Sequence, residues 1–412
     1  MPTSDEAEQL DAADTLGPLR EFFRLPADTV YLDGNSLGAL AAHIPDRLSQ
    51  VLTREWGDSL IGAWTEHDWW SAPLRVGDRI GRLIGAAPGQ VTVGESTSVQ
   101  LFNALAGAAR LRPGREVIVT DAGHFPTDRY LADSVARLLG MRVIAVPAAE
   151  VTATVRHWSG QVAVVAVPAV DYRTGELWDV AEVTAAAHAA GAVTVWDLCH
   201  AAGAVPLALD DDGVDLAVGC TYKYLGGGPG APAFVYLAGR HQDAYDPPLT
   251  GWHGHAAPFA MEPEFRPADG ISRTRIGTPH VLSLLALDSA LDVFDKADLA
   301  EVRAKSLALG DFFLDCVADL VSEGTFEVVT PRAHRRRGSQ VALRHPAAYE
   351  MITALLERRV IGDMRPPDLL RFGFNALYVS FRDVHRVADE LRDIVRSGCY
   401  RDERFAVRRL IT

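Results

Sequence analysis

Lys223 and Asp197 have side chains and positions suited to chemistry on an imine. The chain contains only three lysines, and Lys223 lies between the apolar run VDLAVG and a glycine cluster, where backbone can approach a ligand closely. Asp197 directly follows the apolar run AVTVW. A lysine amine forms a Schiff base with an aldehyde, and a carboxylate stabilises a protonated ring nitrogen. The pair therefore predicts a site for pyridoxal 5'-phosphate (PLP); for each residue alone, the alternatives are a structural lysine and a helix N-cap.

A phosphate and an aromatic ring would need further partners, and the sequence offers candidates for both. Thr97 and Ser98 lie at the start of a helix-like segment (GESTSVQLFNALAGAAR), where hydroxyls, backbone N–H groups and the helix dipole favour an anion. Plain N-capping is their structural alternative. Phe125 follows the apolar run EVIVT and offers a ring face, with core packing as the alternative.

Alternating apolar and helical segments must position these residues. The predicted strands cover 116–120, 142–147, 161–167, 192–196, 214–219 and 232–238, and the segments 127–139 and 179–190 have helical composition. Continuous apolar strands separated by helices predict a mainly parallel α/β sheet, covered on both faces. Ligands bind outside the carboxyl ends of such strands, where Asp197 and Lys223 are expected.

A different pattern begins near residue 280. We predict a long helical stretch over 281–321, short strands at 326–330 and 340–343, and amphipathic helices near 346–359 and 384–396. The predicted organisation is a large PLP-binding domain over 46–295 and a smaller α+β domain over 296–412, which an N-terminal segment (1–45) joins. Lys296 and Lys305 lie in charged helical sequence and are expected on solvated faces.

Composition excludes several classes of protein. The 412 residues are 48% hydrophobic and 23% charged, which is typical of a globular protein. Lys+Arg 40 against Asp+Glu 54 gives a net charge of −14, which argues against nucleic-acid or anionic-membrane partners. The four cysteines lack C-x-x-C spacing, the N-terminus is acidic and no apolar run reaches membrane length. These features predict a cytoplasmic protein with reduced thiols and no metal centre.

Six motifs together resemble those of the kynureninases, in that family's order and spacing: YLDGNSLG (31–38), FPTD (125–128), DLCHAAG (197–203), YKYLGGGPG (222–230), GWHGH (251–255) and RIGTPH (275–280). The resemblance covers roughly residues 30–385. It implies the fold type I architecture of PLP-dependent transferases, with a mainly parallel seven-stranded sheet, and a homodimer. It also implies hydrolysis of L-kynurenine to anthranilate and L-alanine, in tryptophan catabolism by the kynurenine pathway or in NAD biosynthesis.

Carried over by position, the resemblance implies a role for each matching residue. Lys223 would hold PLP as a Schiff base and move protons, with Tyr222 as acid/base assistant. Asp197 would pair with the ring nitrogen and Phe125 would stack on the ring. The remaining cofactor contacts would come from Asp128, His200, Thr97, Ser98, Tyr222, Trp252 and Thr278, some of them across the dimer. The substrate would be bound by Arg371, through its α-carboxylate, and by Asn35, Trp64, Gly277 and Thr278.

Trp64, Gly277 and Thr278 resemble the bacterial pattern that favours kynurenine more than the animal pattern that favours its 3-hydroxy form. A pocket lined by Trp has no group to pair with an added hydroxyl, although such pockets reject a hydroxyl only weakly. Cys199 departs from the alanine that is commoner in the family and would bring a thiol near the cofactor.

Two other classes of protein compete with this interpretation. A class V aminotransferase or a cysteine desulfurase shares the lysine and aspartate motifs. A desulfurase needs a mobile, exposed thiol, and neither Cys316, in an apolar helical stretch, nor Cys399, near a helix end, fits that need. A non-catalytic scaffold of the same fold would be expected to have lost Lys223 or Asp197, and both are present.

Overall fold

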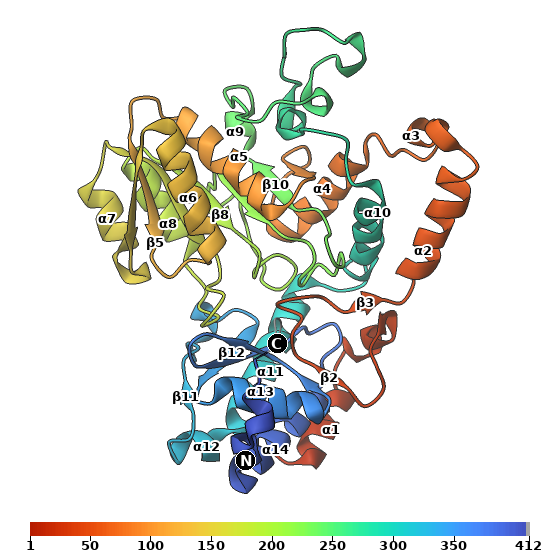
Figure 1. Cartoon of the computed structure of the whole chain (residues 1–412), viewed down its shortest axis with the longest axis vertical. Coiled ribbons are helices and arrows are strands. Elements are labelled where there is room, and N and C mark those ends of the chain that lie inside the picture. The colour runs from red at the N-terminus through yellow and green to blue at the C-terminus, as the bar shows by residue number, and fades with distance from the viewer. Residues whose placement is uncertain (409–412) are drawn as a thin grey trace. The chain divides into compact units, whose positions relative to one another are not determined.

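The structure is a computed structural model that describes residues 1–408 and divides the chain into two compact units (Figure 1). The larger unit comprises Ile44–Val170 and Trp178–Leu291. The smaller unit comprises Met1–His43, the short segment Asp171–Leu177, and the chain from Asp292 onward. The domain boundaries at 45/46 and 295/296 stay a prediction, because compactness alone does not show that a unit folds independently.

A seven-stranded sheet forms the centre of the larger unit, in the order β4-β10-β9-β8-β7-β5-β6. Its strands are β4 (Val91–Val93), β5 (Val117–Asp121), β6 (Arg142–Val146), β7 (Val162–Pro168), β8 (Val193–Asp197), β9 (Leu216–Gly219) and β10 (Phe234–Leu237). Strands β5 to β9 are parallel, and β10 runs antiparallel to both β9 and β4. The mainly parallel sheet and its six predicted strands are confirmed. The strand β4 was not predicted, because three residues are too short for a pattern.

The helices of the larger unit are α2 (Ile44–Gln50), α3 (Ala63–Glu66), α4 (Ala72–Ile84), α5 (Thr97–Arg110), α6 (Pro126–Leu139), α7 (Val151–His157), α8 (Val180–Ala189), α9 (Gly239–Gln242) and α10 (Val281–Ala290). The helix α5 packs against β7 to β10 and against α6. Its Leu101, Ala104 and Ala108 are buried, and small residues let the helix approach the strands closely.

The smaller unit is α+β, as predicted. Its helices are α1 (Ser4–Ala12), α11 (Leu299–Cys316), α12 (Ala318–Ser322), α13 (Ala348–Glu357) and α14 (Phe381–Ser397). Its strands are β1 (Phe23–Arg24), β2 (Val30–Tyr31), β3 (Leu40–Ala41), β11 (Glu327–Val328), β12 (Gln340–Arg344), β13 (Val360–Ile361), β14 (Asp363–Arg365) and β15 (Leu369–Gly373). The order β11-β12-β15-β14 makes an antiparallel sheet. The pairs β1–β3 and β2–β13 stand apart from it.

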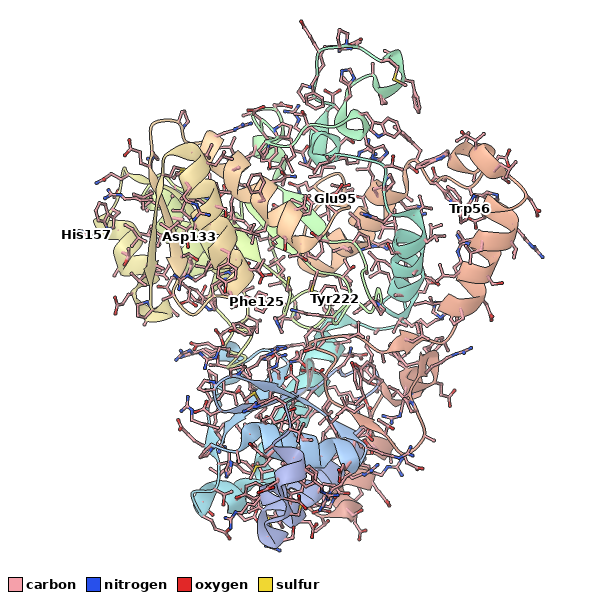
Figure 2. All side chains as sticks on the ribbon, in the orientation of Figure 1. Trp56, Glu95, Phe125, Asp133, His157 and Tyr222 are labelled. Atoms are coloured by element: carbon pink, nitrogen blue, oxygen red, sulfur yellow. The ribbon has the colours of Figure 1, made fainter. Side chains whose placement is uncertain are left out.

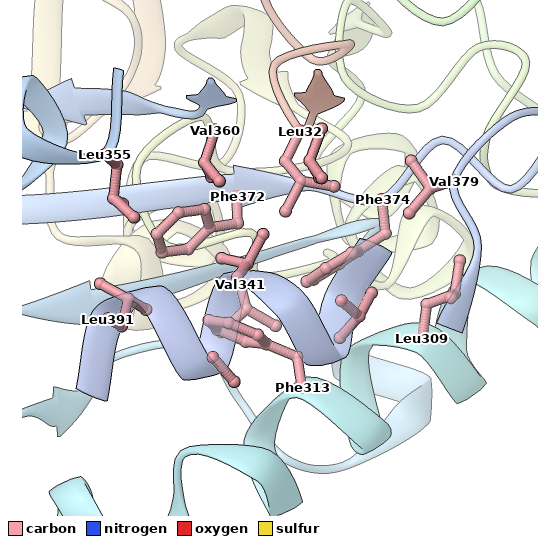
Figure 3. Packing of buried hydrophobic residues seen from close by; sticks show 14 of the residues in the cluster. Leu32, Leu309, Phe313, Val341, Leu355, Val360, Phe372, Phe374, Val379 and Leu391 are labelled. Carbon is pink, nitrogen blue, oxygen red and sulfur yellow. The ribbon is translucent and has the colours of Figure 1, made fainter. Parts of the chain in front are cut away.

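The core of the smaller unit lies between this sheet and its helices (Figure 3). Phe372 of β15 packs on Phe313 of α11, with ring centroids 5.1 Å apart, and Val341 of β12 joins them. Burying an aromatic side chain of this size stabilises the fold by about 1.5–3 kcal/mol. Because side chains alternate along a strand, Phe372 in the core sends the neighbouring Arg371 to the opposite face of the sheet.

Two predictions for this part of the chain were wrong. The helical stretch over 281–321 is not continuous, because α10 ends at Ala290 and α11 begins only at Leu299. The Asp298 side chain accepts a hydrogen bond from Ala300 N and starts the new helix. Lys305 does not lie on a solvated face: it is 8% exposed, and its Nζ lies 2.6 Å from Asp14 Oδ2. Lys296 is exposed, as expected.

Within residues 1–408, no helix combines the length and the apolar character needed to cross a bilayer. All four cysteines are free thiols, as predicted.

Candidate active site

Lys223 and Asp197 lie at the same edge of the larger sheet. Asp197 is the last residue of β8 rather than the first residue after it, and Lys223 follows the end of β9, the parallel neighbour of β8. Lys223 Nζ lies 3.0 Å from His200 Nε2 and 5.9 Å from the centroid of the Tyr222 ring. The structure thus brings together Lys223, His200 and Tyr222, three residues that the resemblance assigned to one site.

A buried acidic group lies beside this lysine. Asp128 lies in the first turn of α6. One side-chain nitrogen or oxygen atom of each of His124, Asp128 and Asp197 lies within 4.8 Å of the other two. Burial and the neighbouring Asp197 raise the pKa of Asp128 well above its usual range, while Lys223 acts to lower it. Asp128 Oδ1 has no hydrogen-bond partner among the described residues.

This group of residues fits the ring of PLP better than it fits a metal ion. Two neighbouring carboxyls, one with an unpartnered buried oxygen, provide acceptors for a protonated ring nitrogen. A divalent cation is disfavoured, because the positive charge of Lys223 acts on the same carboxyls. Asp197 Oδ1 also accepts a hydrogen bond from Cys199 N at 2.8 Å, which fixes the orientation of that carboxylate.

The start of α5 fits a phosphate. Ser96 is the N-cap and accepts a hydrogen bond from Val99 N, so Thr97 and Ser98 are the first two residues of a 14-residue helix. Ser98 is exposed and Thr97 is half-buried. Unpaired N–H groups and the positive end of the helix dipole favour an anion at this position.

Phe125 and Tyr222 have different surroundings, although both lie along the lower edge of the larger unit in Figure 2. Phe125 is 42% exposed, so its ring is not packed into the core and a face is accessible to a ligand. Burial, with Cys220 and Cys199, raises the pKa of Tyr222, so the phenol keeps its proton. A hydrogen bond with Cys220 and burial raise the pKa of Cys199, which keeps that thiol unreactive.

Trp64 and Trp252 are brought together through Trp70. The ring centroids of Trp70 lie 6.4 Å from those of Trp64 and 5.4 Å from those of Trp252. Thr278 is exposed in the loop before α10, beside Gly277. Within residues 1–408, no hydrogen bond, ion pair or ring interaction joins either tryptophan, or Thr278, to Lys223.

The two predicted substrate ligands Arg371 and Asn35 belong to the smaller unit. Arg371 is 0% exposed and makes a two-pronged ion pair with Asp363, its register partner in the β14–β15 hairpin, so it is not a surface charge. Asn35 Nδ2 donates to Gln340 Oε1 at 3.2 Å. Gly373 makes room for Asn35, because a Cβ there would lie 2.1 Å from Asn35 Oδ1.

Sequence reasoning missed His124 and the partners of Arg371. His124 stands directly before the motif FPTD (125–128), and its spacing of four residues from Asp128 was the signal that could have placed the two side chains together. Asp363 and Arg365 precede Arg371 in DMRPPDLLR. A short antiparallel hairpin over these residues would have paired Asp363 with Arg371, and this hairpin was not predicted.

Comparisons with known proteins agree with this fold. Cysteine desulfurases from Thermococcus onnurineus and Escherichia coli superpose with a TM-score of 0.79 each, at 16% and 19% identity, over 92% and 93% of this chain and 98% and 99% of theirs. A family model described as Cys/Met metabolism PLP-dependent enzyme matches residues 76–231. The fold and the site thus define a PLP-dependent enzyme of fold type I.

Sequence comparison is more specific. A kynureninase from Deinococcus radiodurans is 51% identical over 94% of this chain and 95% of its own length, and one from Burkholderia pseudomallei is 46% identical over the full length of both. A model of the kynureninase C-terminal domain matches residues 302–391. The chain belongs to the kynureninase family, and it is a PLP-dependent enzyme that cleaves a carbon–carbon bond by hydrolysis.

Proposed function

We propose that the enzyme hydrolyses L-kynurenine to anthranilate and L-alanine, with PLP bound to Lys223. The observation that carries this proposal is the position of Lys223 beside His200 and next to two buried carboxyls at one edge of the larger sheet. This combination supplies an amine for the aldehyde of PLP and acceptors for its ring nitrogen. The family of the chain supports the choice of substrate.

The larger unit would hold the cofactor. Asp197, with Asp128 close by, keeps a proton on the ring nitrogen, and Phe125 packs on the ring. Thr97 and Ser98 bind the phosphate at the start of α5. The other proposed cofactor contacts come from His200, Tyr222, Trp252 and Thr278. Because Trp252 is 40% exposed and clusters with Trp70, we propose that it serves the site of a partner subunit in a homodimer.

The residues of the chain bind the substrate and move its protons. When bound, PLP supplies a conjugated system that accepts electron density from the substrate. Lys223 removes the proton from the substrate Cα, and Arg371 binds the α-carboxylate. Tyr222, whose pKa is raised by burial, acts as the acid at the γ-carbonyl oxygen while water adds to the γ-carbon. The Cβ–Cγ bond then breaks, anthranilate leaves, and protonation of Cβ gives alanine.

Kynurenine is the preferred substrate over 3-hydroxykynurenine in this proposal. Trp64 belongs to an aromatic cluster with Trp69 and Trp70, which offers no acceptor to an added hydroxyl. Gly277 and Thr278 complete the proposed substrate contacts together with Asn35. The enzyme would act in the cytoplasm, in tryptophan catabolism by the kynurenine pathway or in NAD biosynthesis.

A desulfurase function is not favoured by the cysteine of α11. Cys316 is buried, and burial raises its pKa to about 12. A thiol that is buried and protonated lacks the reactivity needed to accept sulfur.

Anthranilate fluorescence tests the proposal directly. PLP-loaded wild-type protein is given L-kynurenine, beside Lys223→Ala and, as a matched control, the exposed Lys296→Ala. We expect wild type and Lys296→Ala to release anthranilate, and Lys223→Ala to lose about a thousandfold or more of the rate. Wild-type protein that carries PLP but releases no anthranilate would contradict the proposed function.

A further inference from the structure

Cys199 and Cys220 lie side by side at the edge of the sheet that carries the candidate site. Asp197 of β8 pairs in register with Val218 of β9, and each cysteine follows its member of that pair by two residues. The Cys199 sulfur accepts a hydrogen bond from Cys220 N at 3.2 Å, and the Cys220 sulfur lies 3.8 Å from Cys199 O. Neighbouring strands lie about 4.7–4.9 Å apart, within the Cα separation of about 4.4–6.8 Å that a disulfide needs. The backbone positions of the two cysteines therefore suit a disulfide.

The two thiols differ in how readily they ionise. Burial alone would raise the pKa of Cys220. The Cys199 thiol, the Lys223 amine and the Tyr222 hydroxyl act in the opposite direction, and together they lower that pKa. Since the thiolate is the form that attacks an oxidant, Cys220 is the nucleophile of the pair. Cys199 keeps its proton and is the neighbouring thiol that can resolve an oxidised Cys220.

Only a small oxidant can reach this pair. Cys199 is 9% exposed and Cys220 is 3% exposed. Hydrogen peroxide is little larger than water, whereas glutathione and the common thiol reagents are much bulkier. A peroxide is therefore the class of oxidant that suits the site.

The pair also contacts two residues of the proposed mechanism. Cys199 N donates to Asp197 Oδ1 at 2.8 Å. The Tyr222 hydroxyl forms a hydrogen bond with the Cys220 sulfur. A disulfide leaves Cys199 N unchanged but converts the Cys220 sulfur into a neutral sulfur, which is a weak acceptor. Oxidation thus removes the hydrogen bond that holds the Tyr222 phenol.

We propose that Cys199 and Cys220 form a reversible disulfide when the enzyme meets hydrogen peroxide, and that this modification lowers its activity. In the first step the Cys220 sulfur attacks one peroxide oxygen, the O–O bond breaks, and the leaving hydroxide takes up a proton to give water. In the second step the Cys199 sulfur attacks the sulfur of the resulting sulfenic acid, the S–O bond breaks, and the leaving hydroxide takes the Cys199 proton. Two thiols and one peroxide become one disulfide and two molecules of water. A dithiol such as dithiothreitol reduces the disulfide again.

Peroxide treatment of the PLP-loaded wild type tests the disulfide. The four thiols are counted in the denatured protein before and after treatment, and unreduced peptides are mapped by mass spectrometry. We expect a cross-linked peptide pair, lighter by two hydrogen atoms, that joins Cys199 to Cys220, and the loss of these two thiols from the count. Four remaining thiols, or a loss of thiols without this cross-link, would overturn the inference.

Anthranilate release by the same samples tests the effect on activity, and this part rests on the proposed function. We expect the rate to fall about tenfold or more on oxidation and to recover with dithiothreitol. A wild type that forms the cross-link but keeps its full rate would overturn the effect on activity. A wild type that releases no anthranilate before treatment would contradict the proposed function, and the peptide map would still decide the disulfide.

Two variants separate the pair from the other cysteines. Cys199→Ala keeps the backbone N–H beside Asp197 but lacks the resolving thiol. It should form no cross-link, and dithiothreitol should no longer restore its rate, because excess peroxide oxidises Cys220 further to the sulfinic acid. Cys399→Ala is the matched control, because this half-buried cysteine belongs to the smaller unit, and it should form the cross-link as the wild type does.

Inactivation of Cys199→Ala that dithiothreitol reverses as fully as in the wild type would overturn the inference. If this variant fails to fold, the same measurements on Cys199→Ser decide.

Discussion

Arg371 in the smaller unit and Asp128 in the larger unit are both buried ionisable side chains, but their partners differ. Arg371 donates four hydrogen bonds, two of them to an ionised carboxylate in its own hairpin. Asp128 lies beside a second acid, Asp197, and keeps an unpartnered oxygen. The charge of Arg371 is compensated within its own unit, whereas Asp128 keeps an acceptor that a ligand can use.

The comparison predicts that removing a charge has opposite effects on stability in the two units. The largest effect is expected for Asp363→Asn. Asp363 is 2% exposed, and its loss leaves two guanidinium groups without their shared carboxylate. The holoenzyme should lose about 3–5 kcal/mol of unfolding free energy, measured by urea denaturation. Glu327→Gln removes a carboxylate that is 64% exposed and should change stability by less than about 1 kcal/mol. Equal losses of unfolding free energy in Asp363→Asn and Glu327→Gln would contradict the view that the buried carboxylate compensates the two guanidinium groups.

In the larger unit, Asp197→Asn should reduce activity without reducing stability. The neutral amide still accepts from Cys199 N, and it removes the repulsion that raises the pKa of Asp128. We expect anthranilate formation to fall about 100-fold or more at saturating PLP, while the melting temperature stays equal or rises. Glu182→Gln, on the exposed face of α8, should leave both quantities unchanged. A large drop in melting temperature for Asp197→Asn would contradict this view of the site.

The Asp33→Asn variant tests the effect of a buried carboxyl in the smaller unit through the pH dependence of stability. The pKa of Asp33 is raised to about 7, by burial first and by Asp363 next, with Ser36, Arg371 and Arg365 acting to lower it and Tyr31 packed nearby. The native state therefore binds a proton that the unfolded state has released, and wild-type stability falls as pH rises from about 4 to about 7. The asparagine cannot ionise, so its unfolding free energy lacks this pH dependence. The difference in unfolding free energy between variant and wild type should therefore be about 1–3 kcal/mol more favourable to the variant at pH 8 than at pH 4.

Urea denaturation at the two pH values measures this gain. Asp28→Asn is the control, because Asp28 is exposed in the same segment and should show no such difference. An Asp33→Asn protein whose stability tracks the wild type at both pH values would show that Asp33 is ionised throughout.

The smallest effect is expected for Trp64→His. Because apolar pockets reject an added hydroxyl only weakly, the ratio of kcat/KM for 3-hydroxykynurenine over kynurenine should rise about three- to tenfold. Steady-state rates with both substrates measure it, and Trp56→His, at a tryptophan that is 53% exposed, is the control. An unchanged ratio of kcat/KM for the two substrates would contradict a contact between Trp64 and the substrate.

The sequence predicted the larger unit better than the smaller one, for a physical reason. The strands β5, β7, β8 and β9 are buried on both faces and are mainly apolar, so a short window of sequence identifies them. The pairing of Asp363 with Arg371 depends on a hairpin whose strands are too short to give a pattern. The salt bridge from Lys305 to Asp14 joins residues nearly 300 positions apart, and no local pattern shows it.

The candidate site residues show the same difference between local sequence patterns and contacts that depend on the fold. Lys223, Asp197 and Thr97 could be proposed from the sequence because each ends, follows or starts a regular element, where chemistry of this class is expected. His124 and Arg365 were missed because their importance depends on which side chains lie beside them in space. Family motifs named Arg371 but gave no information about how many of its donors were already used.

The segment Asp171–Leu177 has a consequence for the way this molecule can change over evolution. The chain leaves the larger unit after Val170 and returns to it at Trp178. Between these points, the Tyr172 carbonyl accepts a hydrogen bond from Arg371. The smaller unit is therefore assembled from three separate stretches of sequence. Recombination could not transplant it into another protein as one cassette, because the C-terminal stretch taken alone would leave behind Ser36 and Tyr172, two of the partners that orient Arg371.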